Sequence, residues 1–197
     1  MNKLEAQAII ENTGNYDEEE IEDIIEIYET VMKHVGFEDN RRDNRFIVKF
    51  HDIFYYAPKE IEDTDEFNGL FDAFCEDMYD NIIDQADEKH IDIDEMLHPM
   101  YVGHYQTFVV NIEEITNENA IDVAMRVYDE FNYEGKEYVE NYIYLVSLLQ
   151  DLEDNYMEYW FDFLDGNEYY TQQTIDEMKE KYHKDMERRK AAQTLAK

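Results

Sequence analysis

The sequence contains two rows of carboxylates whose spacing matches the turn of an α-helix. Asp72, Glu76, Asp80 and Asp84 follow one another at four-residue intervals, and Asp87 comes three residues later. On a helix this spacing places the carboxylates on one face in steps of roughly 6 Å, where they can pair with Lys and Arg side chains of a partner. The predicted partner-binding residues of the two rows are Glu18, Glu22, Asp23, Glu26, Asp72, Glu76, Asp80, Asp84 and Asp87.

Rows of carboxylates without intervening basic residues destabilise a helix, so their presence needs an explanation. Like charges at this spacing destabilise a helix by roughly 0.2–0.5 kcal/mol per pair, and solvated protein surfaces usually mix the two signs. One such row is commonly no more than a solvated helix face. Two rows in a chain of extreme acidity favour a binding role instead.

The charge of the chain limits the class of its partners. The sequence has 17 Lys and Arg residues against 50 Asp and Glu residues, a formal charge of −33. Residues 178–197 contain seven basic and three acidic residues, so residues 1–177 carry −37. A field of this sign repels nucleic acids and anionic lipid surfaces. We therefore expect a basic protein partner, with no direct binding of nucleic acid and no binding to a membrane.

The composition is that of a folded protein rather than a disordered acidic tail. Of the 197 residues 44% are hydrophobic, and 17 Tyr, 11 Phe and one Trp provide large side chains for a core. We expect a single acidic globular domain over residues 1–177, followed by a basic C-terminal helical tail over residues 178–197. This tail either is exposed or folds back onto the acidic body.

Hydrophobic periodicity predicts several helices. Apolar residues recur at helical spacing over residues 17–35, 65–87, 118–131 and 136–164, and the last of these is expected to be a long central helix. β-branched and aromatic residues predict strands over residues 45–56 and 101–112. The expected fold is mainly α or α+β, with about five to six amphipathic helices and a small two- to three-stranded sheet.

The sequence has no signature of an enzyme or a cofactor site. It lacks a phosphate-binding Gly-rich loop, a nucleophile elbow and a Cys-x-x-Cys pair, so we expect no catalytic residue and no cofactor. Two Glu-x-x-His pairs, Glu95/His98 and Glu180/His183, have the spacing found in di-iron bundles, but about one such pair is expected by chance. We expect no metal site. Cys75 follows Phe74 on the apolar side of its helix and is expected to be a buried, inert thiol.

The sequence also predicts the compartment. It has no targeting signal at its N-terminus, no apolar run near the roughly 20 residues that span a bilayer, and a single cysteine. We expect a cytoplasmic protein.

In its small size, acidity, aromatic content, helical scaffold and lone cysteine, the chain resembles the DNA-mimic inhibitors of phages and mobile elements, the anti-restriction and anti-CRISPR proteins. The resemblance implies a non-enzymatic phage protein that acts in the host cytoplasm. Its carboxylates would stand in for DNA phosphates in the nucleic-acid groove of a host defence nuclease. Such a target is a restriction enzyme, a CRISPR-Cas effector or its ribonucleoprotein complex, and its DNA binding would be blocked.

Two other classes of function stay open. One is an acidic adaptor or chaperone for a basic protein, and the other is a carboxylate-bridged metalloprotein. A homodimer formed through aromatic surface is also compatible with the sequence.

Overall fold

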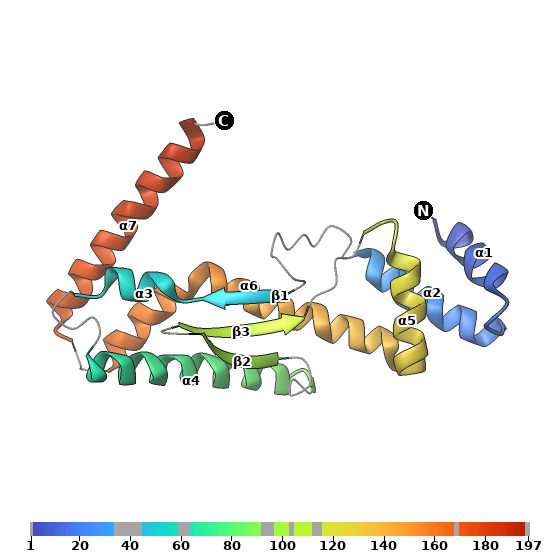
Figure 1. Cartoon of the computed structure of the whole chain (residues 1–197), viewed down its shortest axis with the longest axis horizontal. Helices are drawn as coiled ribbons and strands as arrows, with labels where there is room; N and C mark the ends of the chain where they lie inside the picture. Colours follow the sequence, from blue (N-terminus) through green and yellow to red (C-terminus); the bar gives the residue numbers. More distant parts are fainter. Residues whose placement is uncertain are drawn as a thin grey trace. The chain divides into compact units, whose positions relative to one another are not determined.

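The computed structural model of the chain describes residues 2–33, 45–58, 64–91, 97–102, 105–111, 116–167 and 170–195 (Figure 1). The chain is mainly helical, which confirms the coarser part of the expected fold class. It divides into two compact units. Unit 1 comprises Met1–Ile47, Ile91–His98 and Val109–Leu149, and unit 2 comprises Val48–His90, Pro99–Phe108 and Gln150–Lys197.

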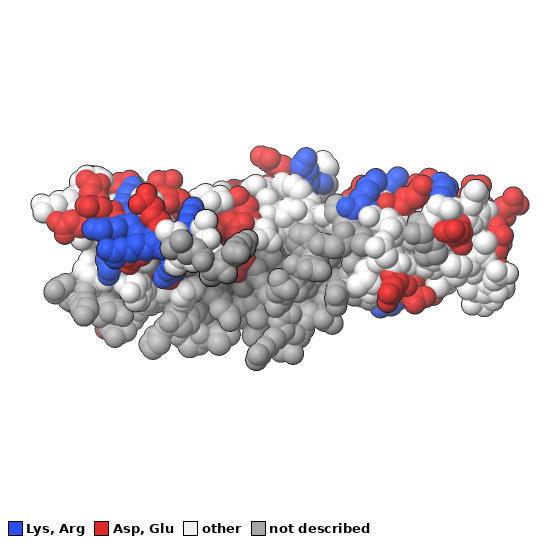
Figure 2. Space-filling view, turned by 90° about the horizontal axis from the view of Figure 1, so that it is seen from above, with Lys and Arg blue, Asp and Glu red and all other residues white. Residues whose placement is uncertain are grey.

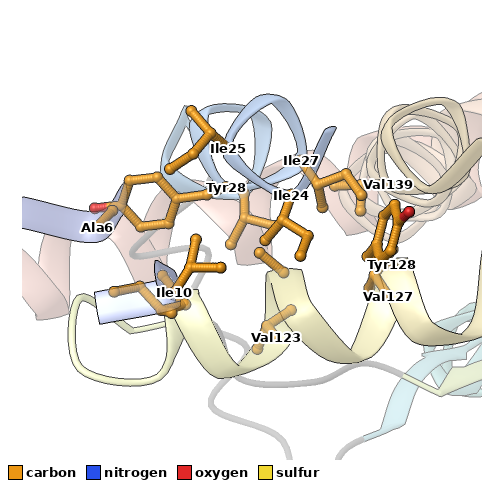
Figure 3. Packing of buried hydrophobic residues seen from close by; sticks show 14 of the residues in the cluster. Ala6, Ile10, Ile24, Ile25, Ile27, Tyr28, Val123, Val127, Tyr128 and Val139 are labelled. Atoms are coloured by element: carbon orange, nitrogen blue, oxygen red, sulfur yellow. The ribbon is translucent and has the colours of Figure 1, made fainter. Parts of the chain in front are cut away.

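Unit 1 is built from helices that share an aliphatic core. Its elements are α1 (Lys3–Thr13), α2 (Glu18–Lys33), α5 (Ala120–Phe131), the short 3-10 helix η1 (Asn132–Glu134) and the first part of α6 (Gly135–Gly166). α2 packs against both α1 and α5. The ring of Tyr28 on α2 lies beside Ala6 and Ile10 of α1, and Ile27 lies on the side of Val127 and Val139 (Figure 3). The apolar face predicted for residues 17–35 therefore forms the centre of this core.

Local signals in the sequence fix both ends of α1. The side chain of Asn2 accepts a hydrogen bond from the backbone N–H of Glu5, and the Glu5 carboxylate accepts one from the backbone N–H of Asn2. This capping box satisfies two backbone donors at the helix start. Gly14 ends the helix with a φ of 67°, a left-handed conformation that glycine adopts without strain.

Unit 2 is built around aromatic rings. Its helices are α3 (His51–Tyr56), α4 (Asp65–Asp87), the part of α6 from Gln150 onward, and α7 (Gln172–Leu195). The buried ring of Phe74 on α4 lies 5.2 Å from that of Trp160 on α6 and 5.7 Å from that of Phe50. Trp160 also contacts Phe67, at 6.0 Å. Because each edge-to-face pair adds roughly 0.5–1.5 kcal/mol beyond area burial, these rings fix α4 against α6.

The structure agrees with most of the expected helices and corrects one expected strand. α4, α5 and α6 confirm the helices expected over residues 65–87, 118–131 and 136–164. α2 confirms the helix expected over residues 17–35 as far as Lys33, and residues 34 and 35 lie outside the described part of the chain. The strand expected over residues 45–56 is wrong in its second half, because residues 51–56 form α3. Phe50, Ile53, Phe54 and Ala57 are buried and recur at helical spacing, so burial of this face overrides the β propensity of the segment.

The remaining elements are three short strands. They are β1 (Arg45–Lys49), β2 (Leu97–Val102) and β3 (Tyr105–Asn111), and they pair in the order β1-β3-β2. α7 continues without interruption through residues 177 and 178, where the sequence placed the start of the basic tail. In the part of the chain that the structure describes, no helix is both long and apolar enough to cross a membrane.

The junction between η1 and α6 yields a test of the unit 1 core. A Cβ atom added to Gly135 would lie 2.7 Å from Ile27 Cδ1 and 2.9 Å from Val127 Cγ1, closer than carbon atoms can pack. We expect Gly135→Ala to lower the free energy of unfolding by about 1–2 kcal/mol because the core is already full. Urea denaturation followed by circular dichroism measures this change.

Gly69 provides the matched control for this substitution. It lies inside α4, and an added Cβ atom would meet no atom within 4 Å. Gly69→Ala should raise the free energy of unfolding by about 0.5–1 kcal/mol through helix propensity alone. Equal effects of the two substitutions would contradict the close approach of α6 to α2 and α5.

Candidate acidic interface

The carboxylates predicted on α4 form one exposed face of that helix, which we call the α4 row. Asp72, Glu76, Asp80, Asp84 and Asp87 are all exposed, and none of them forms an ion pair within the described part of the chain. The opposite side of α4 is buried in the aromatic core. The row is therefore held in place by the core and is open to a partner.

Cys75 lies on the buried side of α4, as expected. It is a free cysteine with 1% of its surface exposed. Burial and the negative charges of Asp72 and Glu76 raise the pKa of its thiol. Because only the thiolate is a good nucleophile, Cys75 is an inert core residue.

The carboxylates predicted on α2 are partly neutralised within unit 1. Glu18, Glu22 and Glu26 are exposed, whereas Asp23 is half-buried. The Nζ of Lys136 on α6 lies 3.1 Å from Glu26 Oε2. This row belongs to unit 1 and the α4 row to unit 2, so each is a surface of its own.

Next to the α2 residues lies a cluster of tyrosines and carboxylates that the sequence pattern did not identify. Tyr16 donates a hydrogen bond from its hydroxyl to Asp129 Oδ1 at 3.1 Å, and its ring meets that of Tyr128 edge-on at 6.0 Å. Burial, followed by the hydrogen bond to Asp129, raises the pKa of Tyr16. Burial and the charges of Glu20 and Asp23 raise the pKa of Tyr128. An arginine binds well to this combination of ring face and carboxylate.

No periodicity in the sequence could have revealed this cluster. Tyr16 and Asp129 are 113 positions apart, and only the packing of α2 against α5 brings them together. Tyr133, on η1, is also exposed, with 73% of its surface accessible.

A third carboxylate row lies on α6, and sequence reasoning missed it. We call it the α6 row. Its members are exposed and spaced by three or four residues; they are Asp151, Asp154, Glu158, Asp162 and Asp165. The three- and four-residue spacing of Asp and Glu that identifies the α4 row is also present here, in a segment whose apolar stripe is the stronger pattern. The α4 and α6 rows belong to the same unit.

α7 pairs its basic residues with the α6 row and with α3. Lys179 Nζ lies 2.7 Å from Asp165 Oδ2, and His183 Nε2 lies 2.8 Å from Glu158 Oε1. The hydrogen bond from Lys179 lowers the pKa of Asp165. Basic and acidic side chains gather around α7 in Figure 2. Lys179 and His183 therefore contact the α6 row, whereas residues 187–194 of the same helix are all exposed.

The described residues do not provide a metal site. Among them, no group of three His, Cys, Asp or Glu side chains is placed to hold an ion. His183 of the Glu180/His183 pair contacts Glu158 instead. Glu95 lies outside the described residues, and the side chain of His98 is not among those described.

Comparison with known proteins returned no relatives. No family model, curated protein or solved structure matches the chain. The function must therefore be inferred from the geometry and charge of the described residues.

The α4 row yields a test of its own electrostatic cost. Asp80→Lys replaces repulsion toward Glu76 and Asp84 with attraction, so the free energy of unfolding should rise by about 1 kcal/mol at low salt. Asp80→Asn should give about half of this gain because it only removes the repulsion. Urea denaturation in low salt and in 1 M salt measures both. A gain that persists in 1 M salt would show that charge is not its cause.

The α6 row yields a test based on pH. The hydroxyl of Tyr159 donates to Asp151 Oδ2 at 2.5 Å. This bond, burial and the charge of Asp151 raise the pKa of Tyr159 to about 12. The folded protein therefore keeps this proton between pH 10 and 12, where the unfolded chain releases it. The stability that the bond contributes is complete below pH 10 and should be lost as the pH rises to about 12.

An NMR titration of ring-labelled tyrosine measures this pKa, with Tyr159→Phe assigning the signal. Asp151→Asn should move the pKa of Tyr159 back toward 10 and flatten the alkaline loss of stability. An unchanged pKa in Asp151→Asn would rule out the bond as its cause.

Proposed function

We propose that this chain is a non-enzymatic inhibitor whose acidic helices occupy the nucleic-acid groove of a host defence nuclease, either a CRISPR-Cas effector or a restriction enzyme, and block DNA binding. One observation carries the proposal. The α4 row presents five exposed carboxylates, none of them ion-paired within the described residues, on a helix that an aromatic core holds in place.

The charge density of unit 2 can be compared with that of a DNA duplex. From Asp72 to Asp87 the α4 row extends over about 22 Å at 1.5 Å per residue. The α4 and α6 rows together carry ten carboxylates over about this length. A DNA duplex carries one charge per roughly 1.7 Å, or about 13 over the same distance. The α4 row alone, with five carboxylates, therefore presents fewer charges than a duplex of this length, and Glu158 and Asp165 of the α6 row are already paired with α7.

Long-range attraction supports the proposal. A formal charge of −33 produces a field that steers the chain toward the same basic groove that attracts DNA. Binding of the acidic chain to the groove and binding of DNA to the groove both weaken as the salt concentration rises. The inhibitor and DNA therefore compete under the same conditions.

A second candidate function is an adaptor for a basic protein. The observation that favours it is the docking of basic α7 onto the α6 row, since this surface already binds Lys and His side chains. The two candidates differ in the target. An inhibitor lowers DNA binding by a nuclease, whereas an adaptor binds a basic protein that has no nuclease function.

Competition with DNA tests the proposal. Fluorescence polarisation measures labelled DNA bound to each of a panel of purified restriction enzymes and CRISPR effector complexes, with the acidic chain in excess. We expect the chain to displace DNA from at least one of them. The triple variant Asp72→Lys, Glu76→Lys and Asp80→Lys should weaken this competition at least about tenfold because it reverses the middle of the α4 row.

A matched variant separates the row from the total charge. Glu11, Glu118 and Glu134 are exposed and lie outside the three rows, and changing all three to Lys alters the net charge by the same amount. This control should compete as the unchanged chain does, and circular dichroism shows that both triple variants fold. Undiminished DNA binding by every nuclease on the panel, or equal loss in both variants, would refute mimicry through the α4 row.

A further inference from the structure

The contacts of α7 reveal what the acidic surface of unit 2 is built to bind. Two basic residues of α7, Lys179 and His183, bond to Asp165 and Glu158 of the α6 row. A third, Arg189, has its Nη1 3.7 Å from Asp52 Oδ2 on α3. The surface formed by α3 and the α6 row, which we call the helix-docking surface, therefore already holds three basic side chains of one helix.

The first half of α7 is held by apolar packing, and the second half is held by the ring of Tyr182 together with polar contacts. Ile175 and Met178 are buried, and Met178 is the last fully buried residue in the described part of α7. Beyond it, His183 Nε2 reaches the exposed carboxylate of Glu158, and Arg189 Nη1 lies 3.7 Å from Asp52, whose side chain is 13% exposed. Exposed ion pairs contribute little and are screened by salt. The second half of α7 is thus the part that separates most readily.

The fit of α7 on the helix-docking surface is also incomplete. Tyr56 on α3 is 2% exposed, and its hydroxyl forms no hydrogen bond within the described part of the chain. Its ring meets that of Tyr182 of α7 edge-on at 5.3 Å, and Lys181 Nζ lies 5.3 Å from its centroid. A buried hydroxyl without a partner opposes the docking of the helix that covers it. A different helix that offers this hydroxyl a partner would fit better.

We infer that the helix-docking surface is a binding site for a basic helix of the partner protein, which α7 fills in its absence. The expected partner helix carries basic residues at the relative spacing of Lys179, His183 and Arg189, with an aromatic residue in the place of Tyr182. Partner binding displaces the second half of α7. This inference rests on the proposed function in one respect, that the partner is a basic protein.

A variant with a weakened internal contact tests the inference. Lys179→Glu together with Arg189→Glu places like charges opposite Asp165 and Asp52 and should release α7. Hydrogen exchange of the full chain reports the release. We expect amides of residues 179–190 to lose at least about tenfold in protection in the variant, and in the unchanged chain at high salt, because an undocked helix of this length is marginal.

A peptide of residues 172–195, which carries Lys179, His183 and Arg189 at their native spacing, then serves as the helix probe. Fluorescence anisotropy should show it binding at least about tenfold more tightly to the released variant than to the unchanged chain, because α7 no longer competes. Adding Glu158→Lys and Asp165→Lys to the released variant should abolish this binding.

The outward side of α7 offers a control of equal charge. Lys184 and Arg188 are exposed, and neither forms an ion pair with α3 or α6 within the described part of the chain. Lys184→Glu with Arg188→Glu should leave both the exchange rates and the affinity for the peptide as in the unchanged chain.

Three results would overturn the inference. One is equal peptide affinity in the released and control variants, and another is peptide binding that survives reversal of Glu158 and Asp165. The third is a stable dimer of the released variant in light scattering, since the surface would then take α7 of a second copy. None of these assays contains a nuclease, so their failure and a failure of DNA competition are distinguishable.

Discussion

The packing of aromatic rings in unit 2 is the interaction on which its acidic surfaces depend. Four neighbouring like-charge pairs in the α4 row cost about 1–2 kcal/mol in total. Each buried Phe on the other side of α4 contributes about 1.5–3 kcal/mol, and Phe67, Phe71 and Phe74 are all buried. The rings therefore outweigh the repulsion severalfold. A helix with this charge pattern stays folded because its apolar side buries several large aromatic side chains.

The three carboxylate rows differ in how far the chain itself neutralises them. On α2, Glu26 pairs with Lys136. On α6, Glu158 and Asp165 pair with α7. The α4 row has no such pairs within the described residues. The repulsion that a basic partner relieves is therefore greatest on α4, which makes that row the primary surface of the proposed inhibitor.

Local periodicity made part of this arrangement predictable from the sequence. It identified α4 with its row because burial and charge both repeat every turn along that segment. It failed for α3, where β-branched and aromatic residues concealed the helical spacing of Phe50, Ile53 and Phe54. It could not find the contact of Tyr16 with Asp129, or the docking of α7, since both depend on tertiary packing between distant segments.

The basic residues of α7 partly neutralise the acidic surface of unit 2. Unit 2 contains 25 acidic and 10 basic residues, and seven of the basic ones come from residue 179 onward. DNA likewise carries condensed cations, which a binding protein releases. If a partner replaces α7, it exchanges one set of ion pairs for another, and the net electrostatic gain is small. Affinity for that surface must then depend on contacts that α7 makes poorly, such as the one offered by the Tyr56 hydroxyl. Electrostatic attraction would bring basic partners to the surface, and a contact with the Tyr56 hydroxyl would distinguish the specific partner from other basic helices.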